Sequence, residues 1–227
     1  VLVPFQYNFD RSGRLPDTSD AQLKKYRDRF YQLYPVSDVE VTVHEAVPWA
    51  QALNRDGSGW QQVGEELAGL RDLETESTPE VYYYAIFNPA TSLNRYCGNG
   101  CLLGVTLLND QPEDTGNPSL RLALGVGFVE TAADTSAHEI GHAHGLMHAR
   151  CGQGLDPNSI DPSFPFPNGG IGVWGFDLVA NKLIAPQGYS DIMGYCDLQW
   201  ISDYHYQKLL NRGRNVNLPR LLVGGGE

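Results

Sequence analysis

Apolar residues in the first 130 positions of the chain follow two alternating patterns. In two stretches they recur every three or four residues, which predicts helices at 20–34 and 60–73. The stretches between and after them are rich in β-branched and other apolar residues and predict strands, at 1–5, 39–43, 81–87, 102–108 and 120–128. Strands and helices in this order indicate an α/β fold with a largely parallel sheet and right-handed crossovers.

The second half of the chain begins with one more helical pattern, at 131–146. Thr131 and Asp134 resemble a capping box at its start, and Gly145 is the expected left-handed residue at its end. Four prolines and little periodicity follow. They predict a long ordered loop over 151–172, and a last helix is expected at 202–211.

The composition of the chain limits what the protein can be. With 227 residues, 41% of them hydrophobic, the chain is long enough to bury one core, and we expect a single domain over 1–227. Sixteen lysines and arginines against 27 acidic residues leave a formal net charge of −11. This charge argues against nucleic-acid binding, because that function needs a basic surface. No apolar run approaches the ~18 residues that span a membrane, so no membrane span is expected.

The four cysteines are Cys97, Cys101, Cys151 and Cys196. Spacing alone allows three pairings. The first two flank a Gly-Asn-Gly turn tight enough for a disulfide, which suggests Cys97–Cys101 and, by remainder, Cys151–Cys196. The alternative is a thiolate metal site, although the usual CxxC spacing is absent. Disulfides imply an oxidising compartment, and because no signal peptide opens the chain at Val1 we expect a mature or trimmed secreted protein.

Four of the six histidines lie between positions 138 and 148. His138 and His142 are one helical turn apart, so both imidazoles can hold one cation from the same face of a helix. Glu139 points about a quarter-turn away, where it can reach a water on that cation without binding the metal. Gly145 ends the helix, which allows the chain to reverse and His148 to return as a third ligand. Three nitrogen ligands with an open fourth position are typical of catalytic Zn²⁺.

The competing interpretation of this segment is an amphipathic helix with solvated histidines. Five specified positions arise by chance in a chain of this size roughly once in ten thousand cases, which disfavours that interpretation. His144 lies on the far side of the helix from His142, and we expect it to pack or to face solvent. His44 and His205 are interpreted as structural residues.

The segment 138–148 and the downstream sequence Ser-Asp-Ile-Met-Gly-Tyr at 190–195 together resemble the metzincins, a family of zinc endopeptidases. The resemblance implies a twisted, mostly parallel five-stranded sheet with helices in an upper subdomain at 1–145. It also implies a loop-rich lower subdomain with a C-terminal helix at 146–227. In the family, the methionine forms an apolar floor beneath the metal without binding it, and Met193 takes that place here. The alternative is an ordinary turn with a core methionine.

Two further residues gain a role through resemblance. Astacins and serralysins carry a tyrosine two positions after this methionine, which approaches the zinc or hydrogen-bonds the oxyanion, so Tyr195 is assigned that role, with a packed tyrosine as the alternative. The segment 172–177 resembles a Trp-Gly-aromatic-Asp segment of StcE-like secreted bacterial metalloproteases. Its Trp174 is interpreted as either a substrate contact or a core anchor. Ala149, which follows the third histidine, differs from the residues that mark the better-known branches.

The resemblance implies a secreted zinc-dependent endopeptidase that acts on proteins or glycoproteins. Zinc would activate a water, Glu139 would act as general base, and Tyr195 would help to hold the oxyanion. The substrate is expected to lie extended along the predicted strand at 102–108, and the protein is expected to be a monomer. Two alternatives stand beside this one: a non-catalytic metal-containing binding domain, and a zinc amidase that acts on a non-protein substrate such as peptidoglycan.

Overall fold

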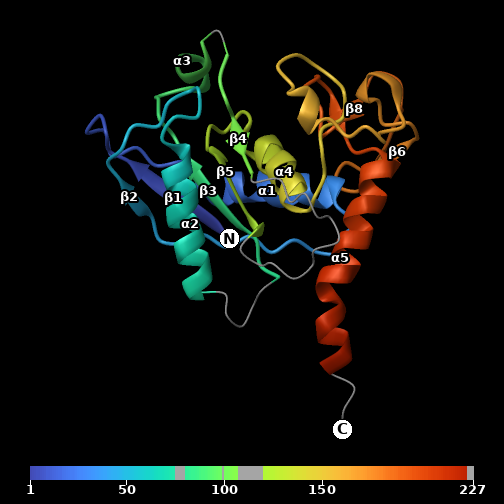
Figure 1. The fold of residues 1–227 in the computed structure, drawn as a ribbon, viewed down its shortest axis with the longest axis horizontal. Helices are drawn as coiled ribbons and strands as arrows, with labels where there is room; N and C mark the ends of the chain where they lie inside the picture. Colours follow the sequence, from blue (N-terminus) through green and yellow to red (C-terminus); the bar gives the residue numbers. More distant parts are fainter. Residues whose placement is uncertain (75–79, 99, 107–119, 224–227) are drawn as a thin grey trace.

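The structure, a computed structural model, describes residues 1–74, 80–98, 100–106 and 120–223, with 216–223 as backbone only. It is a mixed α/β fold built on a five-stranded sheet with the strand order β2-β1-β3-β5-β4 (Figure 1). The pairs β1–β2, β1–β3 and β3–β5 are parallel, and β4–β5 is antiparallel. The strands are β1 (Leu2–Tyr7), β2 (Val47–Trp49), β3 (Tyr83–Phe87), β4 (Gly104–Val105) and β5 (Leu122–Val126). The mostly parallel sheet expected from the sequence is therefore confirmed.

Helices cover both faces of this sheet. One face packs against α2, and the other packs against α1 and α4 (Figure 1). The short helix α3 precedes β4, and α5 ends the described chain. The helices are α1 (Asp20–Leu33), α2 (Trp60–Glu74), α3 (Leu93–Cys97), α4 (Ala132–Ala143) and α5 (Asp203–Val223). None of the helices in the described ranges is long and apolar enough to cross a membrane.

The alternation of side chains along β3 decides which helices meet each face of the sheet. Tyr83, Ala85 and Phe87 belong to the core cluster around α2, whereas Tyr84 and Ile86 belong to the cluster around α1 and α4. All five side chains are buried, because helices cover this central strand from both sides. The continuous apolar run seen in the sequence is the consequence.

The strand predicted at 39–43 is wrong. β2 lies farther along the chain, and in the predicted stretch only Val43 forms an isolated bridge, to Leu2. No side chain of 39–43 is buried, whereas Trp49 in β2 is buried and meets the ring of Phe5 edge-on at 5.4 Å. Burial of the large indole therefore decides which stretch joins the sheet, and the alternation of smaller valines does not.

The predicted strands at 1–5, 81–87 and 120–128 correspond to β1, β3 and β5. Within the predicted strand 102–108, only the two residues of β4 are paired, and 107–108 lie outside the described residues. The sequence pattern did not indicate α3. It also ended the last helix at residue 211, whereas α5 continues to Val223. Leu209 is the last residue of α5 in the core cluster among the residues whose side chains are described, which end at residue 215.

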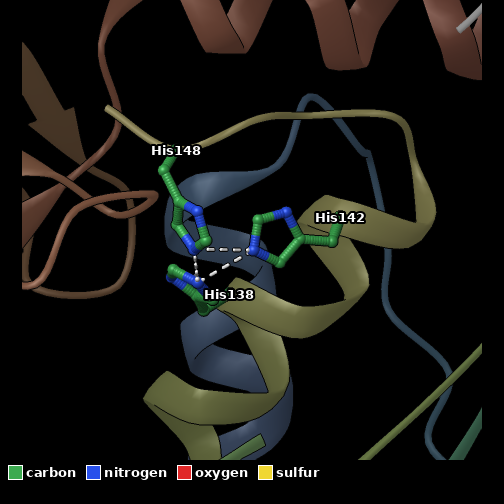
Figure 2. A group of neighbouring side chains, drawn as sticks. All are labelled: His138, His142 and His148. Atoms are coloured by element: carbon green, nitrogen blue, oxygen red, sulfur yellow. Dashed lines mark hydrogen bonds between the residues drawn. The ribbon is translucent and has the colours of Figure 1, made fainter. Parts of the chain in front are cut away.

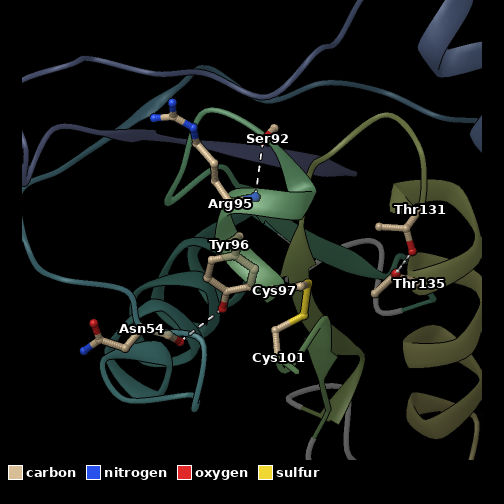
Figure 3. The surroundings of a disulfide bond; sticks show 8 residues. All are labelled: Asn54, Ser92, Arg95, Tyr96, Cys97, Cys101, Thr131 and Thr135. Carbon is tan, nitrogen blue, oxygen red and sulfur yellow. Dashed lines mark hydrogen bonds between the residues drawn. A yellow bond between two sulfur atoms is a disulfide. The ribbon is translucent and has the colours of Figure 1, made fainter. Parts of the chain in front are cut away.

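The two ends of α4 differ in how well the sequence predicted them. The capping box assigned to Thr131 and Asp134 is wrong, because the Thr131 side chain forms no capping bond and its hydroxyl pairs with Thr135 Oγ1 at 2.9 Å (Figure 3). The C-terminal prediction is confirmed, since Gly145 has a φ of 88°. Only glycine adopts that conformation readily, and the chain reverses there.

After α4 the chain forms short elements. Two 3₁₀ turns, η2 (Pro157–Ser159) and η3 (Pro167–Gly169), lie in the predicted loop, and β6 (Gly175–Asp177) and β7 (Lys182–Ile184) form an antiparallel hairpin. β8 (Ser190–Asp191) and β9 (Gln199–Trp200) pair in parallel. This region holds no large sheet, so its shape depends on turns and cross-links.

Both expected disulfides are present. Cys97 at the end of α3 pairs with Cys101 just before β4 (Figure 3), and Cys151 pairs with Cys196. In the same region the Tyr96 hydroxyl donates a hydrogen bond to the carbonyl of Asn54 at 3.1 Å. The first disulfide therefore closes a small turn between α3 and the edge of the sheet, and the second joins two distant segments.

Candidate functional site

Three histidines converge at the end of α4 (Figure 2). His138 and His142 project from one face of the helix, and their Nε2 atoms lie 3.1 Å apart. The turn at Gly145 brings His148 back, so that its Nε2 lies 3.3 Å from that of His138 and 3.1 Å from that of His142. All three side chains are buried, each less than 9% exposed. The arrangement expected from the sequence is therefore the one that the structure contains.

The second ring nitrogen of each histidine faces an acceptor. His138 Nδ1 donates to the carbonyl of Ile192 at 2.7 Å, and His142 Nδ1 donates to the carbonyl of Leu146 at 2.7 Å. His148 Nδ1 donates to Ser159 Oγ at 2.8 Å, because that hydroxyl gives its own proton to the carbonyl of Asp156. Each neutral ring then carries its proton on Nδ1 and presents a lone pair at Nε2.

Three lone pairs that face one another at this separation could share a cation. Four ligands placed tetrahedrally at the usual Zn–N distance of about 2.0–2.1 Å lie about 3.3–3.4 Å apart, close to the separations of the three Nε2 atoms. Burial lowers the pKa of all three histidines, that of His148 to about 4, so the imidazoles are neutral at physiological pH. His138, His142 and His148 could therefore hold a metal ion without first losing protons.

Glu139 lies beside the triad with its side chain buried. Its Oε2 accepts a hydrogen bond from Thr106 Oγ1 at 3.1 Å, and the same hydroxyl lies 2.9 Å from the Glu139 carbonyl. Burial raises the pKa of the carboxyl group to about 8, although the hydrogen bond from Thr106 acts in the opposite direction. A carboxyl group with a pKa close to neutrality is suited to accept and return a proton.

Gly104 in β4 leaves the space that the Glu139 side chain occupies. A Cβ atom at this position would lie 2.6 Å from Glu139 Oε1, far inside van der Waals contact. We expect Gly104→Ala to displace the carboxyl group and to break its hydrogen bond to Thr106, because the added methyl group and the carboxyl group cannot occupy the same space. A crystal structure of the variant, with metal affinity measured in parallel, checks this expectation. An unmoved carboxyl group would contradict it, and a loss of metal affinity would show a broader distortion.

A cleft of about 1210 Å³ opens over His138 and Glu139. Its lining includes residues 102–104, at and before β4, and residues 194–199. Among the described residues, β4 is the last strand of the sheet and pairs with β5 alone. An extended chain in the cleft could pair with this edge.

Met193 and Tyr195, which the sequence singled out after the histidines, lie close to α4 and to the cleft. Met193 is fully buried and packs against α4 at Gly141, where a Cβ atom would lie 2.7 Å from its Sδ. Tyr195 lines the cleft with half of its side chain exposed, and its ring centre is 5.1 Å from that of His148 and 5.7 Å from that of His138. The methionine is thus a packing residue against the helix, and the tyrosine is part of the lining of the cleft.

The Cys151–Cys196 disulfide joins the segment after His148 to the segment after Met193. Next to it, the N–H of Tyr195 donates to the Cys151 carbonyl at 2.7 Å. The two segments that complete the site beyond α4 are therefore fastened to each other. This arrangement restrains both the third histidine and the tyrosine.

Removal of this disulfide by Cys151→Ser with Cys196→Ser is expected to lower the free energy of unfolding by about 4 kcal/mol, because it closes a loop of 45 residues. The matched control is Cys97→Ser with Cys101→Ser. That disulfide spans four residues, so the same chain-entropy argument gives a loss of about 2 kcal/mol. Urea unfolding of both variants measures the difference. An equal loss in the two variants would contradict the argument from loop length.

Other residues singled out in the sequence lie away from the triad. Trp174 lies on the segment leading into β6, is 61% exposed and does not line the cleft. His144 stacks on Tyr82 with ring centres 4.3 Å apart. His44 contacts Glu74, and His205 is buried against Asp191.

Sequence reasoning missed the groups that orient the histidines and Glu139. Thr106, after β4, donates to Glu139, and Ser159, in η2, accepts from His148; nothing in the spacing of these two hydroxyl residues marks them. The acceptors for the other two histidines are the backbone carbonyls of Leu146 and Ile192, which every residue type supplies. These partners could be identified only from the three-dimensional structure.

Comparisons with known proteins assign no family to this chain. A scan against models of protein families finds no match, and a search of curated proteins finds no similar sequence. The function must therefore be argued from the chemistry of the site.

Proposed function

We propose that the protein is a secreted zinc endopeptidase that cleaves peptide bonds in proteins or glycoproteins. The observation that carries the proposal is the convergence of three histidine Nε2 atoms beside the buried carboxyl group of Glu139, where His138 and Glu139 line a cleft next to the edge strand β4. A metal ion that only stabilised the fold would not need a general base beside it. The sequence resemblance to metzincins, through the zinc motif and Met193, points to the same activity.

The donor set favours zinc. Neutral imidazoles suit zinc, and three protein ligands leave a coordination position open, as catalytic zinc requires. When bound, the metal would supply Lewis-acid chemistry, lowering the pKa of a water and polarising a carbonyl oxygen. His138, His142 and His148 would hold it, and their Nδ1 hydrogen bonds would keep the rings in the ligating tautomer.

The residues of the chain then divide the remaining work. Glu139 would take a proton from the attacking water and deliver it to the departing amine as the C–N bond breaks. Thr106 would hold the carboxylate in place through the 3.1 Å hydrogen bond. Tyr195, half-exposed at the cleft, would donate a hydrogen bond to the oxyanion that forms on the substrate carbonyl. The substrate backbone would pair with β4 across the cleft.

Two disulfides support an oxidising, extracellular setting. In such a setting the available substrates are secreted or surface-bound proteins, many of them glycosylated. A cleft of about 1210 Å³ has room for several residues of a polypeptide, which favours internal cleavage over removal of single terminal residues.

A library of peptides, bare and glycosylated, digested and read by mass spectrometry, tests this proposal. We expect internal cleavage that stops with a chelator, returns with zinc, and is absent from Glu139→Ala. Cleavage that survives this substitution would contradict the mechanism. A protein that binds zinc yet cleaves no peptide, but hydrolyses peptidoglycan amides, would replace the endopeptidase with an amidase.

A further inference from the structure

The first two turns of α5 contact both segments that complete the candidate metal centre. The contacts run through two buried carboxylates, Asp161 at 6% exposure and Asp191 at 0%. Asp161 lies in the segment that follows His148, and Asp191 lies two residues before Met193. These carboxylates belong neither to the ligand set nor to the cleft wall.

Asp191 connects α5 to His138. Its Oδ2 accepts from the N–H of Ser202 at 2.8 Å, and its Oδ1 accepts from His205 Nδ1 at 2.8 Å. Oδ1 also accepts a hydrogen bond from the backbone N–H of Met193 at 2.8 Å, which fixes the peptide group between Ile192 and Met193. The Ile192 carbonyl of this peptide group accepts the hydrogen bond from His138 Nδ1. The orientation of His138 therefore depends on an anchor at the start of α5.

Asp161 connects α5 to His148 in a parallel way. Its Oδ2 accepts from Lys208 Nζ at 2.6 Å and from the Tyr204 hydroxyl at 3.0 Å. Its backbone N–H donates to the His148 carbonyl at 2.9 Å, and the N–H of His148 donates to the Ser159 carbonyl at 2.9 Å. The Ser159 hydroxyl also accepts from His148 Nδ1. The short segment 159–161 thus holds the third ligand by its backbone and its ring, and α5 holds the segment.

We propose that residues 202–208 form a positioning platform for the metal centre, with Asp161 and Asp191 as positioning residues that act through His148 and His138. The inference rests on the proposed metal site. His142 differs from these two ligands, because the carbonyl of Leu146, in its own helix turn, orients it. Loss of either anchor should leave two ligands in place and loosen one. Loss of such outer hydrogen bonds in metal sites costs about 10–100-fold in metal affinity.

Cobalt(II) binding to the whole chain provides the test, because its visible absorption reports the coordination geometry independently of catalysis. Lys208→Met removes one anchor at a side chain that is 39% exposed, so the fold should persist. We expect the Kd for cobalt to rise about 10–100-fold, metal dissociation to accelerate, and the absorption band to change shape. Asp191→Asn should act in the same direction through the other anchor.

The matched control is Lys24→Met, which removes an ion pair to Asp28 at 2.5 Å on the exposed side of α1. It should leave the Kd, the dissociation rate and the spectrum as in wild type. If Lys208→Met also shows the wild-type Kd, dissociation rate and spectrum, the inference is overturned, even if Asp191→Asn fails to fold. A wild-type protein that binds no cobalt would overturn the metal site and this inference together, whereas binding with unaffected Lys208→Met would overturn the platform alone.

Discussion

Replacing Glu139 by glutamine is expected to lower kcat for the proposed peptide hydrolysis by about 10²–10⁴-fold, because the variant loses the group that we propose as general base. Glutamine has nearly the same shape and can still accept the hydrogen bond from Thr106, so the zinc affinity should stay close to that of wild type. Steady-state kinetics on one library-derived peptide, with zinc affinity measured in parallel, checks both parts. A kcat within a few-fold of wild type would remove Glu139 from the mechanism.

The same substitution should stabilise the metal-free protein. Burial raises the pKa of Glu139 in the folded chain to about 8, from an ordinary value of 4.5. Between these values the unfolded chain releases a proton that the folded chain keeps, so the contribution of this group to stability is complete below pH 4.5 and is lost as the pH rises towards 8. At pH 7 the difference corresponds to about 3 kcal/mol.

Urea unfolding in the presence of a chelator measures this effect. Metal-free Glu139→Gln should exceed metal-free wild type by up to about 3 kcal/mol at pH 7, and the two should converge near pH 4.5. A variant that is more stable than wild type but less active is expected when the replaced residue serves function and lowers the stability of the fold. Equal stability of the two proteins at pH 7 would show that the carboxylate is not buried as described.

Replacing His148 by alanine is expected to weaken zinc binding by more than about 100-fold. Loss of an outer hydrogen bond to a ligand already costs about 10–100-fold, and this variant loses the ligand itself. The control is His144→Phe, since His144 lies in the same stretch of chain but stacks on Tyr82 and is no part of the triad. Its zinc affinity should match that of wild type. Equal losses in the two variants would show that the triad is not the metal site.

The pH dependence of zinc binding provides an independent check of the same triad. Burial lowers the pKa of His148 to about 4 and lowers those of His138 and His142 as well. Protons should therefore compete with zinc only well below the ordinary histidine pKa of 6.5. Zinc affinity is expected to change little from pH 7 to pH 5 and to fall near pH 4. The metal-free fold should lose stability over the same descent, because the unfolded chain takes up protons that the buried rings resist.

Much of the sheet could be predicted because its strands are covered on both sides. A strand such as β3, with all five side chains buried, must be apolar along its whole length, and that run is visible in the sequence. β2 could not be predicted in the same way. It is short and lies at the edge, and only the burial of Trp49 against Phe5 places it there.

The sequence by itself determined the ligand triad, because helical spacing is local: His138 and His142 share a face wherever the helix lies, and Gly145 permits the return to His148. Only the tertiary structure decided what orients those rings. The carbonyl of Ile192 and the Ser159 hydroxyl reach the triad from other segments, and Asp191 holds the peptide that carries the first of them; hydrogen bonds of this kind depend on how the chain packs. A backbone carbonyl has no side-chain signature, so its partner becomes visible only when the two segments are brought together in space.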